Sequence, residues 1–237
     1  MPKNSRVALI TGGAKRVGRA IAERLSKAGY FIHFTYLSSD AEAQKLATQL
    51  KHAQAIRADL TKPADAITSI QKSGIDRLDI LVNNASLYAP ADLTETTLDL
   101  SRKLMAIHYE SPLLLCQAFA PLLRQSRGHV VNMVDLQVER PNAGYLPYCA
   151  SKAALWNLTL GLARALAPEV TVNGIAPGVV EWPPNYPEDE KEKYLKRVPL
   201  NRPGSPRDVA ELVHYLCTAG SYITGQIIHL DGGRSIT

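Results

Sequence analysis

The sequence predicts an α/β fold, with one doubly wound parallel sheet flanked by helices on both faces. Short β-rich apolar runs alternate along the chain with longer segments of helical periodicity, which is typical of βαβ units. Two of these runs, 80–84 and 130–133, lack the alternation of a half-exposed strand and so fit strands covered on both faces. The expected strands are 6–11, 31–36, 53–58, 78–85, 129–134, 170–176 and 226–230. The expected helices are 17–29, 40–50, 98–124 and 148–166.

Length and composition favour a single domain over residues 1–237. The chain has 237 residues, 46% of them apolar, so folding should bury roughly 70–75% of the surface of the unfolded chain. A core of that size needs no disulfide or metal to hold it together. The 3 cysteines, Cys116, Cys149 and Cys217, form no CxxC pair, which argues against a disulfide framework and a zinc site. We therefore expect no metal and a reducing, cytoplasmic location.

Charge and hydropathy argue against two classes of partner. The net charge of +5 comes from 27 basic and 22 acidic residues scattered along the chain, without the Lys/Arg stripe of a nucleic-acid site. The longest apolar windows, 112–123 and 153–167, are interrupted by Gln, Asn or Arg before the roughly 20 residues of a membrane span. The N-terminal apolar run Val7–Ile10 is too short for the core of a signal peptide. We expect a soluble protein that binds neither nucleic acid nor membrane.

A glycine-rich turn, TGGAKRVG, follows the first expected strand and opens a helix. Gly12 permits the tight turn, Gly18 allows close packing of the helix, and the exposed amides of the helix start would bind a pyrophosphate. In a βαβ series this is a Rossmann-type dinucleotide site. The spacing differs from GxGxxG, because Arg16 stands where a glycine is expected.

The residues after the second strand indicate which dinucleotide is preferred. An acidic residue there would bond the 2′-hydroxyl of NAD and repel the 2′-phosphate of NADP. Here Ser38 and Ser39 precede the first carboxylate, Asp40, and their hydroxyls can donate to phosphate oxygens. Lys15 and Arg16 add positive charge at a helix N-terminus, where solvated cations would oppose the helix dipole. We therefore expect NADP(H).

Tyr148 and Lys152 lie four residues apart in YCASK, on an expected helix. Positions i and i+4 share one face of a helix, so the ammonium group can lie near the phenol. A nearby positive charge stabilises phenolate and lowers the pKa of tyrosine towards a value useful for proton transfer.

A proline-rich stretch, 179–190, follows the strand 170–176. Ligands of open α/β sheets bind beyond the carboxyl ends of the strands, so this loop, extending to about residue 198, is well placed to cover a substrate. The alternative is a linker between domains, but too little chain follows it to form a second core.

Four motifs occur in one order along the chain: TGxxxxxG, NNA at 83–85, YxxxK, and the pair Pro177-Gly178. This constellation resembles the short-chain dehydrogenase/reductase family, and the resemblance covers essentially the whole chain. The family usually has a catalytic serine thirteen residues before the tyrosine, where this chain has Asp135.

Asp135 in place of the usual serine indicates which group within the family the chain resembles. Asp135 with Arg16, Ser86 and Tyr88 looks like the pteridine reductases and the bacterial dihydromonapterin reductase group. A pterin ring presents amide and amine donors, with which a carboxylate can pair, whereas a carbonyl substrate needs a hydroxyl donor.

The resemblance implies NADPH-dependent reduction of a dihydropterin, such as dihydromonapterin or dihydrobiopterin, with dihydrofolate as a further candidate. Hydride would pass from NADPH to an imine carbon, and the neighbouring nitrogen would receive a proton, with Tyr148 as the candidate acid and a cofactor-bound water as the alternative. Lys152 would hold the nicotinamide ribose, Asp135 would orient the pterin and Tyr148, and Tyr88 would stack on the pterin ring.

The resemblance also implies sets of site residues. The catalytic residues are Asp135, Tyr148 and Lys152. The substrate-binding residues are Arg16, Ser86, Tyr88, Asp135, Tyr148 and Trp182. The cofactor-binding residues are Gly12, Lys15, Arg16, Val17, Tyr36, Ser38, Ser39, Asp59, Leu60, Asn84, Ala85, Ser86, Lys152, Pro177, Gly178 and Val180.

Two positions depart from the wider family. His108 replaces the asparagine that usually completes the catalytic set, and it either carries a proton-relay water or satisfies local hydrogen bonds at a helix bend; the second interpretation is favoured. Val179 follows Pro177-Gly178 where a threonine is often found. Trp182 and Tyr186 either line the substrate pocket or anchor their loop by packing.

Two other functions stay open. One is NADPH-dependent reduction of a small carbonyl compound, and the other is regulation by a non-catalytic NADP-binding protein, against which the intact Tyr148 and Lys152 argue. The resemblance further implies a homotetramer built through the helical stretches 98–124 and 148–166, which carry broad apolar faces.

Overall fold

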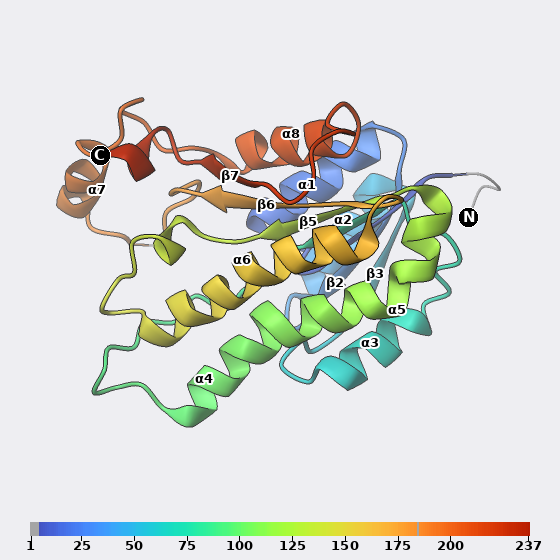
Figure 1. The fold of residues 1–237 in the computed structure, drawn as a ribbon, viewed down its shortest axis with the longest axis horizontal. Coiled ribbons are helices and arrows are strands. Elements are labelled where there is room, and N and C mark those ends of the chain that lie inside the picture. Colours follow the sequence, from blue (N-terminus) through green and yellow to red (C-terminus); the bar gives the residue numbers. More distant parts are fainter. Residues whose placement is uncertain (1–4, 184) are drawn as a thin grey trace.

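One parallel sheet of seven strands forms the centre of the computed structural model, which describes residues 5–183 and 185–237 (Figure 1). The strand order is β3-β2-β1-β4-β5-β6-β7, and every neighbouring pair is parallel. This confirms the predicted fold class. The strands are β1 (Val7–Ile10), β2 (Phe31–Tyr36), β3 (Ala53–Arg57), β4 (Ile80–Asn83), β5 (His129–Met133), β6 (Thr171–Pro177) and β7 (Ile227–Leu230).

Helices cover both faces of the sheet, with α1 and α8 on one side and α3, α5 and α6 on the other (Figure 1). Of the helices that the structure describes, none combines the length and the hydrophobicity needed to cross a bilayer. The helices are α1 (Arg16–Lys27), α2 (Asp40–Leu50), α3 (Pro63–Gln71), α4 (Leu98–Met105), α5 (Ser111–Ser126), α6 (Leu146–Leu166), α7 (Glu188–Leu195) and α8 (Pro206–Leu216).

The strand β1 explains why the central runs are apolar throughout. Ala8 and Ile10 point into the core beneath α1, α2 and α8, whereas Val7 and Leu9 point into the core beneath α3, α5 and α6. All four are buried. A strand covered by helices on both faces has no solvent-facing side, so its sequence shows no alternation.

The sheet reverses its order at β1, which pairs with β2 on one side and β4 on the other. The loops that leave the carboxyl ends of β1 and β4 diverge at such a point and leave a crevice for ligands. The glycine-rich turn follows β1, and Asn84 follows β4. The topology therefore brings two of the sequence motifs together.

Two segments differ from the simplest expectation. The stretch 98–124 is α4 and α5 joined by a π-helical segment, Ala106–Glu110. The loop expected to cover the substrate contains α7, which starts directly after Pro187. Three acidic residues occupy its first turn, where their negative charges interact favourably with the positive end of the helix dipole. Lys193 forms ion pairs with two of them.

Candidate active site

Asp135 and Tyr148 form a hydrogen-bonded pair at the carboxyl end of the sheet. Tyr148 lies in the first turn of α6, and its hydroxyl donates to Oδ2 of Asp135 at 2.7 Å. Asp135 follows β5, and its Oδ1 accepts the backbone N–H of Gln137 at 2.8 Å, which caps the short 3-10 helix Leu136–Val138. The cap fixes the carboxylate, so both of its oxygens already accept one hydrogen bond each.

Lys152 is buried one turn further along α6, with 2% of its surface exposed. Its ammonium group donates to the backbone carbonyl of Met133 at 2.7 Å. Burial lowers the pKa of Lys152 to about 8, against the opposing effect of the Asp135 charge.

The expectation that Lys152 lowers the pKa of Tyr148 is wrong for this site. Burial raises the pKa of Tyr148 well above its ordinary value, and the charge and the hydrogen bond of Asp135 raise it further. The ammonium of Lys152 lies 5.8 Å from the centre of the Tyr148 ring and donates to Met133 instead. The phenol therefore stays protonated, which is the state that a general acid requires.

Aromatic rings form one wall of the site. Tyr88 stacks on Tyr145, with ring centroids 4.4 Å apart and planes at 19°, and meets Tyr148 edge-on at 4.9 Å. Gln137 donates to the hydroxyl of Tyr88 at 3.3 Å. One face of Tyr88 is thus covered by Tyr145, a residue that is not among the site residues expected from the sequence. Its only sequence signal is an aromatic residue three positions before Tyr148.

His108 lies in the π-helical segment between α4 and α5, with 1% of its surface exposed. Its Nε2 is 2.9 Å from the hydroxyl of Ser86, and its Nδ1 is 2.8 Å from the hydroxyl of Ser151. These contacts agree with the interpretation that His108 satisfies local hydrogen bonds. They also connect it to Ser86, one of the expected ligand-binding residues.

The glycine-rich turn requires its glycines for space. Gly12 adopts a φ of +64°, in the left-handed region that favours glycine. A Cβ on Gly13 would lie 2.5 Å from Cβ of Phe34, and a Cβ on Gly18 would lie 2.2 Å from the carbonyl oxygen of Gly12. Gly18 therefore brings the start of α1 against the turn itself.

The N-terminus of α1 is shaped for an anion. Lys15 occupies the N-cap without a side-chain hydrogen bond to the helix, and the first turn holds no acidic residue. The first amides of a helix have no partner within the helix, so a pyrophosphate fits this position.

Both cations of the turn already have acidic partners. Arg16, at a φ of +51°, pairs through Nε with Oε2 of Glu181 at 2.7 Å, and its Nη2 donates to the carbonyl of Glu181 at 3.0 Å. Lys15 pairs with Glu42 at 2.8 Å. The two cations could be predicted from the glycine-rich turn, whereas Glu42 and Glu181 lie outside any motif of the sequence. The Arg16 pair joins the glycine-rich turn to the loop before α7.

Asn84 links the two motifs at the switch point of the sheet. Its side-chain amide donates to the carbonyls of Thr11 and Gly12 at 2.9 and 3.1 Å. The backbone N–H groups of Asn84 and Ala85 both donate to the hydroxyl of Thr11, at 2.9 and 3.0 Å. Asn84 thus fixes the shape of the turn on which a cofactor would lie.

The remaining expected cofactor residues lie along the same edge of the sheet. Asp59 follows β3 and accepts the N–H and the hydroxyl of Thr61 at 3.0 and 2.7 Å, and these hydrogen bonds lower its pKa. Gly178 follows β6, and the next amide, of Val179, donates to the hydroxyl of Tyr194 at 3.1 Å. The others are Val17 at the start of α1, Tyr36 at the end of β2, Ser38 and Ser39 before α2, Leu60 beside Asp59, and Pro177 and Val180 around Gly178.

Trp182 packs within its own loop. Its ring stacks on Tyr186 at 4.9 Å and meets Tyr194 of α7 edge-on at 5.4 Å. These contacts fit the interpretation of Trp182 and Tyr186 as packing anchors. The structure does not bring the Trp182 ring into the stack that Tyr88 forms with Tyr145.

Known proteins resemble this chain over nearly its whole length. The family described as enoyl-(acyl carrier protein) reductase matches residues 12–235. Pteridine reductase 1 of Leishmania tarentolae is 33% identical over 279 residues, covering 98% of this chain and 96% of that protein. The 3-oxoacyl-(acyl-carrier-protein) reductase FabG of Aquifex aeolicus (strain VF5) is 32% identical over 244 residues, covering 96% of each.

A solved structure adds a match in three dimensions. FolM alternative dihydrofolate reductase 1 from Brucella canis, complexed with NADP, is 32% identical with a TM-score of 0.88, covering 98% of this chain and 95% of that one. The sequence motifs, the sheet order and these relatives agree with one another. The chain therefore belongs to the short-chain dehydrogenase/reductase family.

Proposed function

We propose that this protein is an NADPH-dependent pteridine reductase that converts a dihydropterin, such as dihydromonapterin or dihydrobiopterin, to its tetrahydro form. As a member of its family the chain is an oxidoreductase. The observation that carries the finer assignment is the Asp135 carboxylate, which accepts the Tyr148 hydroxyl where the family usually has a serine. The similarity to pteridine reductase 1 and to FolM supports it.

The cofactor is NADP(H), and the residues present fit it. The glycine cradle leaves room for a pyrophosphate at the uncapped N-terminus of α1. No carboxylate occupies the two positions directly after Leu37, where Ser38 and Ser39 stand. NADPH supplies the hydride when it is bound. Lys15 and Arg16 would exchange their exposed partners, Glu42 and Glu181, for phosphate.

The chain's own residues supply the proton and the orientation. Tyr148 holds a proton on its hydroxyl 2.7 Å from Asp135 and can deliver it to a ring nitrogen of the substrate. Each carboxylate oxygen has a further lone pair, so Asp135 can also accept N–H groups of the pterin. Tyr88, supported from behind by Tyr145, offers a ring on which the pterin would stack.

The test measures NADPH oxidation with a panel of dihydropterins, dihydrofolate and simple ketones. We expect rapid turnover of a dihydropterin, and a loss of about 10–100-fold in kcat/KM when Asp135→Ser removes a charged hydrogen-bond acceptor. As a control, Asp76→Ser removes an exposed carboxylate that precedes β4, at the amino edge of the sheet and opposite the site, and should leave turnover unchanged. Turnover of ketones alone, unchanged or improved in Asp135→Ser, would sink the proposal and leave a carbonyl reductase. Cofactor binding without turnover of any substrate would favour a regulatory protein.

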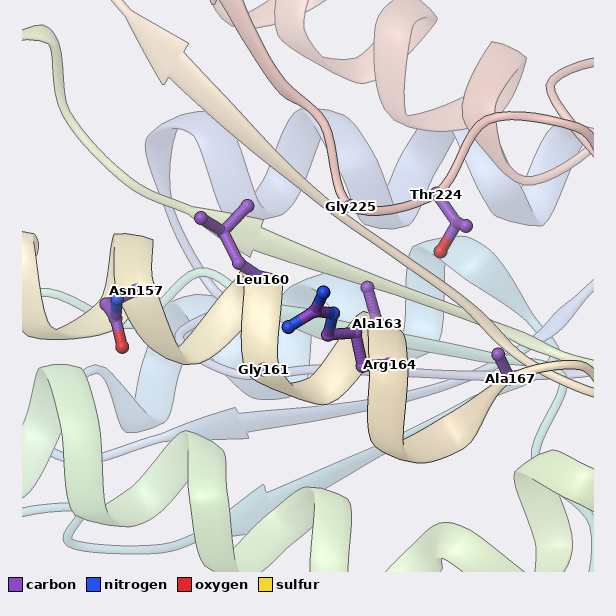
Figure 2. Close-up of a pocket in the computed structure, with 8 residues that line it drawn as sticks. All are labelled: Asn157, Leu160, Gly161, Ala163, Arg164, Ala167, Thr224 and Gly225. Carbon is purple, nitrogen blue, oxygen red and sulfur yellow. The ribbon is translucent and has the colours of Figure 1, made fainter.

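We also propose a homotetramer assembled through the helices of one face. Leu98 at the start of α4 is 65% exposed. A surface hollow of about 700 Å³, away from Tyr148, lies between α6 and the segment before β7 and is lined by Leu160, Gly161 and Gly225 among others (Figure 2). We expect light scattering to give the mass of four chains, and Leu160→Arg to reduce it. A monomeric mass at micromolar concentration would refute the assembly.

A further inference from the structure

A chain of three hydrogen bonds runs from the surface of the site into the protein. The hydroxyl of Ser86 is 2.9 Å from Nε2 of His108, and Nδ1 of His108 is 2.8 Å from the hydroxyl of Ser151. The hydroxyl of Ser151 is in turn 2.7 Å from the backbone carbonyl of Tyr148. Ser151 is fully buried and His108 is 1% exposed, whereas Ser86 is exposed.

The protons of this chain can be assigned by counting donors. A carbonyl oxygen only accepts, so the single proton of Ser151 must lie between its oxygen and Tyr148. If that proton pointed at His108 instead, two oxygens 2.7 Å apart would face each other without a hydrogen between them. Ser151 therefore accepts from His108, and Nδ1 of His108 carries a hydrogen.

The other ring nitrogen must then be an acceptor. Burial, together with the nearby Lys152 ammonium, lowers the pKa of His108 to about 2, so the ring is neutral and holds one proton. That proton is on Nδ1, which leaves a lone pair on Nε2. Ser86 is consequently the donor in its bond to His108, and its only proton points into the protein.

We propose that His108 is a positioning residue that makes Ser86 an obligate hydrogen-bond acceptor, so that the site selects a ligand with an N–H group at this point. The choice of ligand rests on the proposed function, in which the N–H belongs to the amino group or ring of a pterin. The assignment of the protons does not rest on it.

Ser86, with its proton on the His108 side, has the same hydrogen-bonding role towards a ligand as Asp135. Two groups facing the ligand, the Asp135 carboxylate and the Ser86 oxygen, then only accept hydrogen bonds, while Tyr148 provides the acidic proton. A serine with a free proton could donate to the oxygen of a carbonyl substrate. Ser86, with its proton held by His108, lacks that option, so the same chain of bonds disfavours a carbonyl at this position.

The first test determines which ring nitrogen of His108 carries the hydrogen in the ligand-free protein. In a long-range ¹H–¹⁵N spectrum of histidine-labelled protein, we expect Nδ1 of His108 to carry the hydrogen and Nε2 to be bare, with His108→Asn identifying the signals. In Ser151→Ala the acceptor for Nδ1 is gone, and we expect the hydrogen to move to Nε2. A hydrogen on Nε2 in the natural sequence, or no change in Ser151→Ala, would overturn the proposal.

The second test is a double-mutant cycle between Ser86 and Ser151, the two serines whose hydroxyls contact opposite ring nitrogens of His108. Ser151→Ala is expected to raise the KM for the dihydropterin about fivefold, the equivalent of one hydrogen bond. In a Ser86→Ala background the same change should leave KM unaltered, although it lowers the melting temperature in both backgrounds. Equal effects of Ser151→Ala on KM in both backgrounds would indicate a merely structural role.

Thr159→Val is the matched control. It removes another buried hydroxyl of α6 that bonds a backbone carbonyl, that of Leu155 at 2.8 Å, and it should lower stability without changing KM. The N–H that Ser86 accepts could belong to the substrate or to the cofactor. To distinguish the two, the dissociation constant of NADPH is measured in the four proteins of the cycle: the natural protein, Ser86→Ala, Ser151→Ala and the double variant. If the effects of Ser86→Ala and Ser151→Ala on KM are coupled, the N–H belongs to the substrate. If they are coupled only in NADPH binding, the N–H belongs to the nicotinamide carboxamide, and selection of the substrate by Ser86 is refuted. If no dihydropterin is turned over, the proposed function fails, while the spectrum and NADPH binding still report on Ser86.

Discussion

Replacing Tyr148 by phenylalanine is expected to lower kcat for dihydropterin reduction by about 10²–10⁴-fold, the usual contribution of a positioned general acid. The change removes one hydroxyl and keeps the ring, which is 4% exposed and packs edge-on against Tyr88 and His108. The reacting nitrogen then has no proton donor at the place where Tyr148 stands. Asp135 simultaneously loses the donor 2.7 Å from its Oδ2.

The measurement is single-turnover oxidation of bound NADPH, together with the NADPH dissociation constant. We expect the rate to collapse and cofactor affinity to change less than threefold, because the hydroxyl bonds Asp135 and not the glycine-rich turn. Tyr30→Phe is the matched control, since it removes a hydroxyl that accepts from Arg6 at 3.2 Å and belongs to a buried tyrosine before the amino end of β2, at the edge of the sheet opposite the site. A Tyr148→Phe rate within tenfold of the natural protein would mean that another group supplies the proton.

Acidification from pH 6.5 to pH 4 is expected to remove about 3 kcal/mol of unfolding free energy through one side chain, His33. It lies at the centre of β2, fully buried, and within the described residues neither ring nitrogen has a hydrogen-bond partner. Burial lowers the pKa of His33 from 6.5 to about 4. Between these values the unfolded chain binds a proton and the folded protein does not, so stability is full above pH 6.5 and falls as the pH drops towards 4.

Denaturant unfolding of His33→Leu across this pH range tests the prediction. At pH 7 the variant should be more stable by about 1–3 kcal/mol, because two unpaired polar atoms leave the core. Its stability should fall less steeply with acid, although His108, whose pKa is also lowered, still contributes. His52→Leu changes an exposed histidine and should leave the acid dependence intact. An unchanged slope in His33→Leu would show that His33 is solvated or paired in the folded protein.

Most of the sheet could be predicted from the sequence, because burial on both faces leaves a local signal. The run Val7–Ile10 is apolar at every position, and the run Ile80–Asn83 is apolar at every position except the last, Asn83. The helices α3 and α8 were not singled out, although Pro63 and Pro206 begin them in the favoured first position. Helix α7 was missed because the prolines before it dominate the local composition.

The site was predictable where it depends on neighbours in the chain, and less so where it depends on the fold. The pairing of Asp135 with Tyr148 follows from motifs thirteen residues apart. Glu181 lies 165 residues from Arg16, and no local pattern indicates their contact. The pKa of Tyr148 was expected to fall because its helix neighbour is a cation, but burial and a carboxylate from another element decide its direction.

The ion pair between Arg16 and Glu181 gives the ligand-free protein an internal competitor for its own cofactor. Under the proposed role of Arg16, one guanidinium cannot serve a carboxylate and a phosphate in the same place, so each arriving dinucleotide displaces Glu181. The two side chains are 57% and 41% exposed, and such a pair is worth at most about 1 kcal/mol, or about fivefold in an equilibrium constant. When the dinucleotide leaves, Glu181 recovers its partner, so the ion pair raises the dissociation constant of the dinucleotide by up to the same factor.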